Sequence, residues 1–192
     1  ERYLAYMVKQ VLDKNEYELK ILGRDPEKLR PTTEGNFVRL PYDDAVKMLQ
    51  EAGRDFKWGD DFGAPDEGYI SEQYDRPVFI VNYPTSIKPF YMKKNPDNPK
   101  EYLCADVIAP EGYGEIFGGS EREGNYEVLK RQIIDAGLNL EDYQWYLDLR
   151  QFGGVPHSGF GMGFERTIAW VCHLDHIREA IPFPRLINRM QP

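Results

Sequence analysis

Apolar residues recur at helical spacing at the start of the chain, which predicts an amphipathic helix over residues 1–22. The residues that define this face are Leu4, Met7, Val8, Val11 and Leu12. Gly and Pro interrupt the pattern over 23–35, so we expect a loop there. Residues 37–40 predict a short strand. The apolar positions after Pro41 predict a second helix that Gly53 ends.

The second half of the chain is richer in strand patterns. Residues 77–83 are nearly all apolar or β-branched, which is typical of a strand buried on both faces. The acidic, Gly-bearing stretch before it, 58–68, predicts a loop. Helices are expected from the cap residue Asn125, around Trp145 and after Gly163. Further strands are predicted at 87–93, 102–108, 113–117 and 159–163.

These elements indicate the fold class. The strands follow one another through short turns and the helices are grouped rather than alternating with strands, so we expect an α+β fold with a mostly antiparallel sheet flanked by helices. We find no internal repeat and no linker, and 192 residues suit one domain.

Composition and charge narrow the function classes. The chain has 24 Lys and Arg against 32 Asp and Glu, a net charge of −8, so no basic surface is expected to hold a long nucleic-acid backbone. The longest apolar runs, such as Val78 to Val81, have four residues, too few for a membrane span. We expect Cys104 and Cys172 to be buried small side chains in a reducing cytosol. We expect the three Trp residues to lie in the core.

The first residue of the chain is Glu1 rather than Met, and no leader pattern follows it. We therefore expect a chain that was trimmed or truncated.

Two carboxylates on adjacent predicted strands form the first candidate site. If 102–108 and 113–117 fold as a hairpin about Gly112, Asp106 is expected to face Glu115 directly. Opposed carboxylates repel unless a cation or a proton lies between them, and hard oxygen ligands suit Mg²⁺. Solvation of one acid at the sheet edge is the alternative.

Two glycine-rich segments follow. Gly118 and Gly119 allow a close backbone approach, and Arg122 after them presents a rigid fork of donors to a carboxylate or amide oxygen. An ordinary turn with an exposed Arg is the alternative there.

The second segment is a strand with Gly at 159, 161 and 163. These glycines leave one face of the strand without side chains, and an adenine ring would fit on that face. The helix that follows carries Arg166 in its first turn, where N–H groups and a guanidinium can meet phosphate oxygens.

Three other residues are weaker candidates. His157 precedes the Gly-rich strand and is read as a structural loop residue, although a bond to phosphate is possible. Lys88 and Tyr91 are ranked low as lining residues of the same site.

Taken in order, these segments resemble class II aminoacyl-tRNA synthetases, and the asparaginyl branch is the most similar. The resemblance rests on Asp106, Gly114–Glu123, Trp145–Arg150, Pro156–Arg166 and the ending Ile181–Arg185. It covers about residues 1–185 and implies the catalytic-domain fold of that class, in part. Asp106 and Glu115 would then hold Mg²⁺ and the phosphates of ATP.

The resemblance also implies roles for the other residues. Arg166 and Glu115 are the implied catalytic residues. Arg122, with Gly118 and Gly119, would bind the amino acid. Gly118 stands where related aspartyl enzymes carry a Ser ligand, so water would replace that hydroxyl. ATP would lie against Glu115 and a set in the last strand and helix: Gly161, Gly163, Phe164, Glu165 and Arg166.

We do not find the first two motifs of the class or an anticodon-binding domain in this sequence. We therefore expect residues 1–192 to be the C-terminal portion of the catalytic domain of asparaginyl-tRNA synthetase, inactive alone. The complete cytoplasmic enzyme is expected to be a homodimer that uses asparagine, ATP and tRNA(Asn), with no membrane contact. An aspartyl-type enzyme, an asparagine synthetase-like paralogue and a non-catalytic synthetase-like binding protein are the alternatives.

Overall fold

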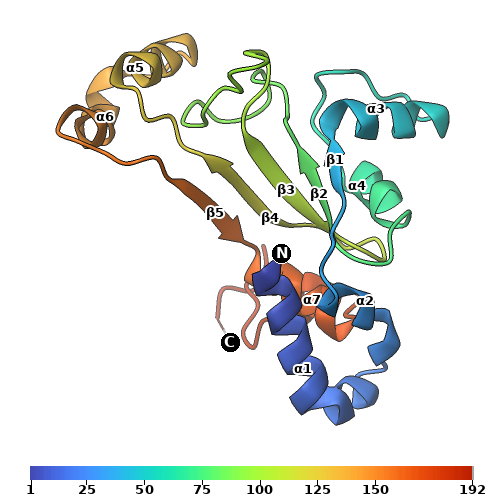
Figure 1. Cartoon of the computed structure of the whole chain (residues 1–192). Coiled ribbons are helices and arrows are strands. Elements are labelled where there is room, and N and C mark those ends of the chain that lie inside the picture. The colour runs from blue at the N-terminus through green and yellow to red at the C-terminus, as the bar shows by residue number, and fades with distance from the viewer. Residues whose placement is uncertain (192) are drawn as a thin grey trace.

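The computed structural model describes residues 1–191, and a five-stranded sheet lies at its centre (Figure 1). The strands follow the chain order across the sheet: β1 (Arg39–Pro41), β2 (Val78–Val81), β3 (Cys104–Ala109), β4 (Gly114–Glu121) and β5 (Ser158–Met162). Only β1 and β2 are parallel, and the other three pairs are antiparallel. The predicted α+β fold with a mostly antiparallel sheet is confirmed.

Seven α-helices and three short 3₁₀ helices surround this sheet within the described residues. The α-helices are α1 (Arg2–Ile21), α2 (Arg30–Thr33), α3 (Tyr42–Glu51), α4 (Ala64–Ser71), α5 (Tyr126–Asp135), α6 (Gln144–Gln151) and α7 (Phe164–Cys172). The 3₁₀ helices are η1 (Pro26–Lys28), η2 (Leu140–Tyr143) and η3 (Ile177–Ala180). Within residues 1–191 no helix is both long and apolar enough to cross a membrane.

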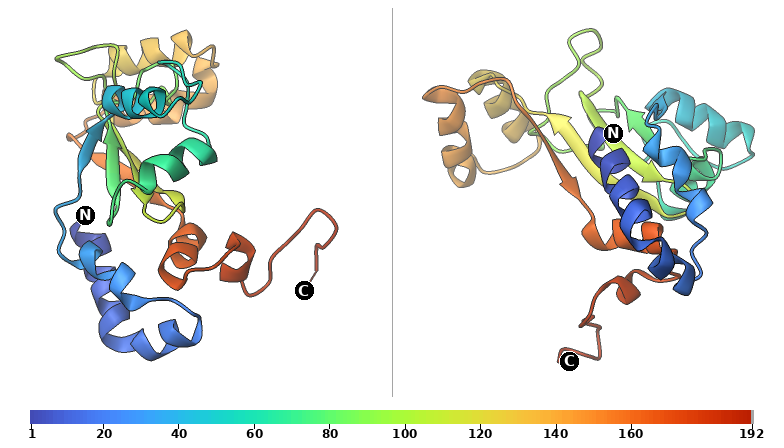
Figure 2. Two further views of the ribbon diagram at one scale, coloured as in Figure 1. Left: turned by 90° about the vertical axis from the view of Figure 1, so that its right-hand side faces the viewer. Right: turned by 60° about the horizontal axis from the view of Figure 1, so that its bottom comes forward.

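The apolar residues form three clusters. Helices α3 and α4 pack with β1, β2 and part of β3 around buried residues such as Leu49, Ile70 and Ile80. Helices α1 and α7 pack on the other face of the sheet around Val8, Phe117 and the fully buried Trp170. Helices α5 and α6 form a small cluster of their own (Figures 1 and 2).

The structure corrects several local predictions. Residues 58–68 are not all loop, because α4 begins at Ala64 after the N-cap Gly63, with Pro65 in its first turn. Residues 87–93 form turns with one isolated bridge between Met92 and Arg122 rather than a strand. The predicted loop over 23–35 contains η1 and α2.

Two of the three Trp predictions were wrong. Trp170 lies in the core, but Trp58 and Trp145 are 53% and 64% exposed. Each exposed indole has a polar partner for its N–H: the Asp43 carboxylate for Trp58 and the Asp142 carbonyl for Trp145. Cys104 is buried as predicted, whereas Cys172 is only half-buried.

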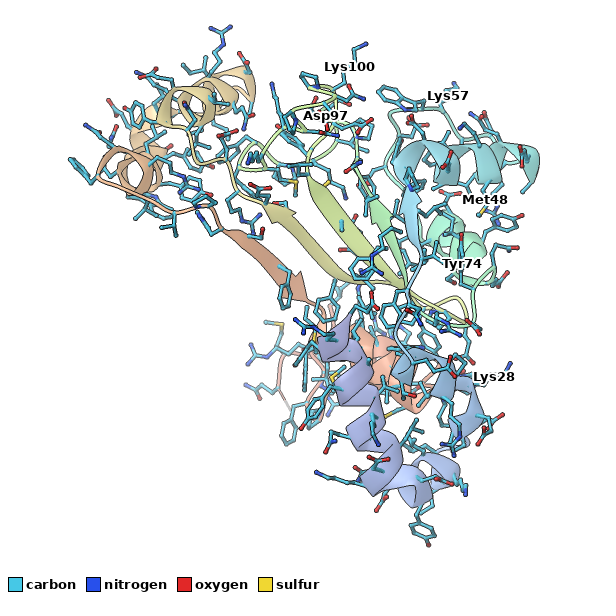
Figure 3. All side chains as sticks on the ribbon, in the orientation of Figure 1. Lys28, Met48, Lys57, Tyr74, Asp97 and Lys100 are labelled. Atoms are coloured by element: carbon cyan, nitrogen blue, oxygen red, sulfur yellow. The ribbon has the colours of Figure 1, made fainter. Side chains whose placement is uncertain are left out.

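Figure 3 shows labelled side chains at opposite ends of the molecule. Asp97 and Lys100 stand on the loop between β2 and β3, at the end of the sheet away from α1, and Lys28 stands near the far end of α1. The face of the central strands between these ends holds the candidate site.

Candidate functional site

The hairpin of β3 and β4 forms as predicted, but its register differs from the prediction. Asp106 lies opposite Gly118, and Glu115 lies opposite Ile108. The pairing shifts between Val107 and Ile108, because β4 carries one extra residue there, Ile116. A direct Asp106–Glu115 pair was therefore wrong.

The β-bulge nevertheless places both acids on one face. Side chains alternate between faces along a regular strand, so in a regularly paired β4 Glu115, three residues before Gly118, would point away from Asp106. A Cβ atom at Gly118 would lie 2.9 Å from Oε1 of Glu115 and 3.2 Å from Oδ1 of Asp106. The two carboxylates thus converge over the bare backbone of Gly118.

A lysine partners one of these acids. Lys88 donates from Nζ to Oδ2 of Asp106 at 2.6 Å and lies 3.9 Å from the ring centre of Tyr83. Burial acts to lower the pKa of Lys88, but the Asp106 carboxylate outweighs it and the pKa is raised. Lys88 was ranked low from the sequence, and its contact with Asp106 comes from the loop between β2 and β3.

A third acid, Glu67 of α4, was missed by sequence reasoning. Its Oε2 accepts the backbone N–H of Glu115 at 2.9 Å. It lies in the stretch predicted to be loop, and no motif marked it. Only the position of α4 beside β4 reveals it. Glu67 and Arg166 also line a cavity of about 530 Å³ with Gly114.

The surroundings of the two half-buried glutamates, Glu115 and Glu67, disfavour the ionised carboxylate and raise the pKa of both. Burial raises the pKa of Glu115, and the nearby Asp106 and Glu67 carboxylates raise it further, while Lys88 and Arg166 lower it. Burial likewise raises the pKa of Glu67, with partial relief from the Glu115 N–H and Arg166. This cluster favours a bound cation, although no group of three or more His, Cys, Asp or Glu side chains in residues 1–191 is arranged as a metal site.

Two glycines of β5 lie on the same face of the sheet as the acids, but only one of them is open to a ligand. Gly159 and Gly161 lie opposite Ser120 and Gly118, so their bare sides continue the face that holds Asp106. A Cβ at Gly161 would meet nothing within 4 Å, whereas one at Gly159 would lie 3.0 Å from the guanidinium of Arg122. The open stretch is therefore at Gly161, next to the acids.

Arg122 is fixed at the other end of this face. Its Nη1 donates to the Ser120 hydroxyl at 2.6 Å, and its guanidinium lies 4.6 Å from the ring centre of Tyr91. Its backbone N–H donates to the carbonyl of His157 at 2.9 Å. The His157 side chain is exposed and its Nδ1 bonds to the Val155 carbonyl, which agrees with a loop role.

Arg166 lies at the start of α7, beside the acids. Its stem lies back over Gly163, where a Cβ would be 3.3 Å from Cδ of Arg166. Its Nη1 donates to the backbone carbonyl of Glu115 at 3.0 Å. The exposed guanidinium thus stands next to the carboxylate pair.

Three predicted site residues do not contact the face that holds Asp106 and Glu115 in the way the sequence suggested. A Cβ at Gly119 would lie 2.8 Å from Cβ of Phe160, so Gly119 belongs to the opposite face of the sheet. Phe164 is 61% exposed and lines an apolar hollow between α1 and α7. Glu165 is half-buried in the first turn of α7.

Comparisons with known proteins establish the family of this chain. The family model described as tRNA synthetases class II (D, K and N) matches residues 1–187. The asparagine--tRNA ligase of Lactobacillus helveticus (strain DPC 4571) is 98% identical over all 192 residues, which span 44% of its length.

Two solved structures are also similar. Asparaginyl-tRNA synthetase from Pyrococcus horikoshii, complexed with asparaginyl-adenylate, is 48% identical with a TM-score of 0.96, covering 100% of this chain and 44% of that one. Aspartyl-tRNA synthetase from Entamoeba histolytica is 28% identical with a TM-score of 0.84, covering 96% of this chain and 39% of that one. Together with the family match over 1–187, the acids of the β3–β4 hairpin and the glycine-rich strand identify this chain as a member of the class II tRNA synthetase family of the D, K and N type.

Proposed function

We propose that this chain is part of an asparaginyl-tRNA synthetase, which activates asparagine with ATP and transfers it to tRNA(Asn). The observation that carries the proposal is the convergence of Asp106 and Glu115 over Gly118, with Arg166 beside them and Arg122 at the other end of the face. Identity of 98% to a longer asparagine--tRNA ligase, against 28% to an aspartyl enzyme, supports asparagine as the amino acid.

The carboxylate pair suits Mg²⁺. Glu115 has a raised pKa through burial and neighbouring acids, and Oδ1 of Asp106 faces the same point over Gly118. Hard oxygen donors on a charged, half-buried surface fit a divalent cation that keeps water ligands. Glu115 and Asp106 would hold the ion, which when bound supplies charge neutralisation to the phosphates of ATP. Water would stand at Gly118, which has no hydroxyl to offer.

ATP is proposed to lie against Gly161 and the start of α7. Gly161 has no neighbour within 4 Å of a would-be Cβ, so a flat base can approach its backbone. Arg166 is exposed and stands beside Glu115, where a guanidinium can bind phosphate oxygens in a bidentate manner. Gly163, Phe164 and Glu165 complete this segment in the proposal.

Arg122 is proposed to bind the side chain of the amino acid. Ser120 and Tyr91 hold the guanidinium in one orientation over Gly159. A guanidinium only donates hydrogen bonds, so it binds an amide oxygen or a carboxylate oxygen alike. Discrimination between asparagine and aspartate therefore requires a further group.

The proposed reaction uses no protein nucleophile. A carboxylate oxygen of asparagine attacks the α-phosphorus of ATP, the bond to the β-phosphate oxygen breaks, and asparaginyl-adenylate and pyrophosphate form. A hydroxyl of the terminal tRNA ribose then displaces AMP. Positioning by Arg122 and Arg166 and charge neutralisation at the acids would supply the rate enhancement.

The extent of the enzyme beyond this chain belongs to the same proposal. The chain spans 44% of the length of the curated relatives it matches. We propose that it is the C-terminal portion of the catalytic domain, that the complete cytoplasmic enzyme is a homodimer, and that residues 1–192 alone do not aminoacylate tRNA.

A chimeric enzyme tests the function. The sequence of this chain replaces the 192 residues that it matches in the L. helveticus ligase. We expect asparagine-dependent exchange of pyrophosphate into ATP, with a loss of about 10²-fold or more in Arg166→Ala. Exchange driven by aspartate would favour the aspartyl alternative, no exchange would reject the assignment, and full exchange in Arg166→Ala would reject the role of Arg166.

A further inference from the structure

We propose that Glu67 of α4 is a positioning residue of this site, which holds the metal-binding carboxylate of Glu115 in place by accepting its backbone N–H. The inference rests on the proposed function for the role of Glu115. It concerns a residue that no motif of the sequence indicates.

The contact is specific in its geometry. Oε2 of Glu67 accepts the Glu115 N–H at 2.9 Å, and the same oxygen would lie 2.5 Å from a Cβ atom at Gly114. No side chain can occupy that point while the Glu67 carboxylate is there. Gly114 also has a positive φ of 73°, so the chain enters β4 by a turn that favours glycine.

The contact lies where the sheet is least regular. The extra residue Ile116 interrupts the pairing of β3 and β4 immediately after Glu115. A bulge leaves backbone groups without regular ladder partners, and these need other ones. Here the N–H of Glu115 bonds to Glu67, and its carbonyl accepts from Arg166 at 3.0 Å.

The direction of Glu115 depends on this bulge, because the bulge interrupts the alternation and lets Glu115, three residues before Gly118, share the face of Asp106. Glu67 and Arg166 thus hold the two backbone polar groups of the residue whose carboxylate faces Gly118. Oε2 of Glu67 is committed to the backbone, so we assign Glu67 to the support of the ligand rather than to the cation.

The hydrogen bond and the charge of Glu67 can be separated by substitution. Glu67→Gln keeps a carbonyl oxygen that accepts the Glu115 N–H but removes the negative charge. Glu67→Ala removes both. If Glu67 acts as proposed, the Gln variant retains cation binding and the Ala variant loses it.

Asp66 provides the matched control in the same helix. Its carboxylate accepts the Gly63 N–H at the start of α4 and lies 3.5 Å from Arg54, with no contact to β4 in either interaction. Asp66→Ala therefore weakens α4 without touching Glu115. It shows what loss of helix stability alone does to the site.

The experiment uses the chimeric ligase described above and two readouts. The first is Mn²⁺ binding, followed by electron paramagnetic resonance with a non-hydrolysable ATP analogue present. The second is the Mg²⁺ concentration at half-maximal asparagine-dependent exchange. We expect Glu67→Ala to weaken Mn²⁺ binding about 10-fold or more and to raise the Mg²⁺ requirement in parallel, as loss of an outer-shell partner does at other metal sites. Glu67→Gln and Asp66→Ala should remain close to the parent.

Three outcomes would overturn the inference: unchanged Mn²⁺ binding in Glu67→Ala, equal losses in the Gln and Ala variants, or a loss in Asp66→Ala as large as in Glu67→Ala. The second outcome would assign the effect to charge. If the parent chimera itself shows no exchange, the proposed function fails. Mn²⁺ binding then still reports whether Glu67 supports Glu115.

Discussion

Glu115 is the residue at which stability and the proposed function conflict most directly. Its carboxylate is half-buried and faces Asp106 and Glu67, and these surroundings raise its pKa. A group whose pKa is higher in the folded than in the unfolded state contributes most stability when protonated, and loses that contribution as the pH rises through the folded pKa. Ionised Glu115 therefore destabilises the fold at neutral pH.

Replacing Glu115 by Gln should consequently stabilise the chain at pH 7. We expect a gain of about 0.5–1 kcal/mol in the free energy of unfolding, since an unfavourable, half-buried charge is removed. The gain should shrink as the pH falls from above the raised pKa toward 4.5, the ordinary value. Urea unfolding of both proteins across this pH range measures it. A gain that persists unchanged at low pH would contradict the charge explanation.

Gly114 is the second position where one residue decides the local structure. A side chain there would meet the Glu67 carboxylate and would have to adopt a φ of 73°. We expect Gly114→Ala to cost about 1–2 kcal/mol from the backbone alone, and more because Glu67 must move. Gly112→Ala is the control, since it has a φ of 84° but nothing within 4 Å of its Cβ position. Equal melting temperatures for the two variants would show that the Glu67 contact contributes nothing.

At the scale of elements, α5 and α6 form a unit that depends on few residues. Its core consists of Leu129, Ile133 and Leu147. Gln132 ties it to the segment before β3 by bonds from Nε2 to the carbonyls of Phe90 and Met92. Such a small cluster predicts a region that opens before the sheet does.

Leu147→Ala should therefore open this unit selectively. A cavity at a side chain that is 1% exposed typically costs about 2–4 kcal/mol, a large fraction of the stability of a three-residue core. Hydrogen exchange should rise over 126–151 and remain slow in β2 and β3. Uniformly faster exchange in the sheet would show that α5 and α6 unfold together with the rest of the chain.

At the scale of the whole molecule, a largely buried ion pair connects the segment after α1 to the sheet. Arg24, just after α1, donates both terminal nitrogens to Glu111 in the turn between β3 and β4, at 2.9 and 2.6 Å. The Arg24 side chain is 1% exposed, and that of Glu111 is 24% exposed. This pair joins segments 87 residues apart and lies at the same end of the sheet as Gly114.

Arg24→Met should destabilise the chain by about 3 kcal/mol, because a bidentate pair with one fully buried partner is broken. Lys47→Ala, which breaks an exposed pair with Asp44, should cost no more than about 0.5 kcal/mol. Chemical unfolding compares the two. A double-mutant cycle with Glu111→Gln isolates the pair, and a coupling energy near zero would contradict its role.

Much of the architecture could be predicted from local patterns. The periodic face of α1, the apolar run of β2 and the caps of α5 depend on neighbours a few residues apart, and these elements are where we predicted them. Helix α4 was missed because its eight residues carry Gly68 and Pro65 and show no apolar period. Trp58 and Trp145 were misplaced because the residue type alone does not decide burial: an indole has a polar N–H as well as an apolar ring, and both of these lie at the surface.

Asp106, Glu115 and Arg166 could be proposed as site residues from the sequence, because acids and arginines beside glycine-rich segments indicate metal and phosphate chemistry. Their arrangement was not evident. A β-bulge adds one residue without a clear local signature, yet it decides on which face Glu115 lies. The partners Lys88 and Glu67 come from segments 18 and 48 residues away from the acids they contact, and only packing brings such distant segments together.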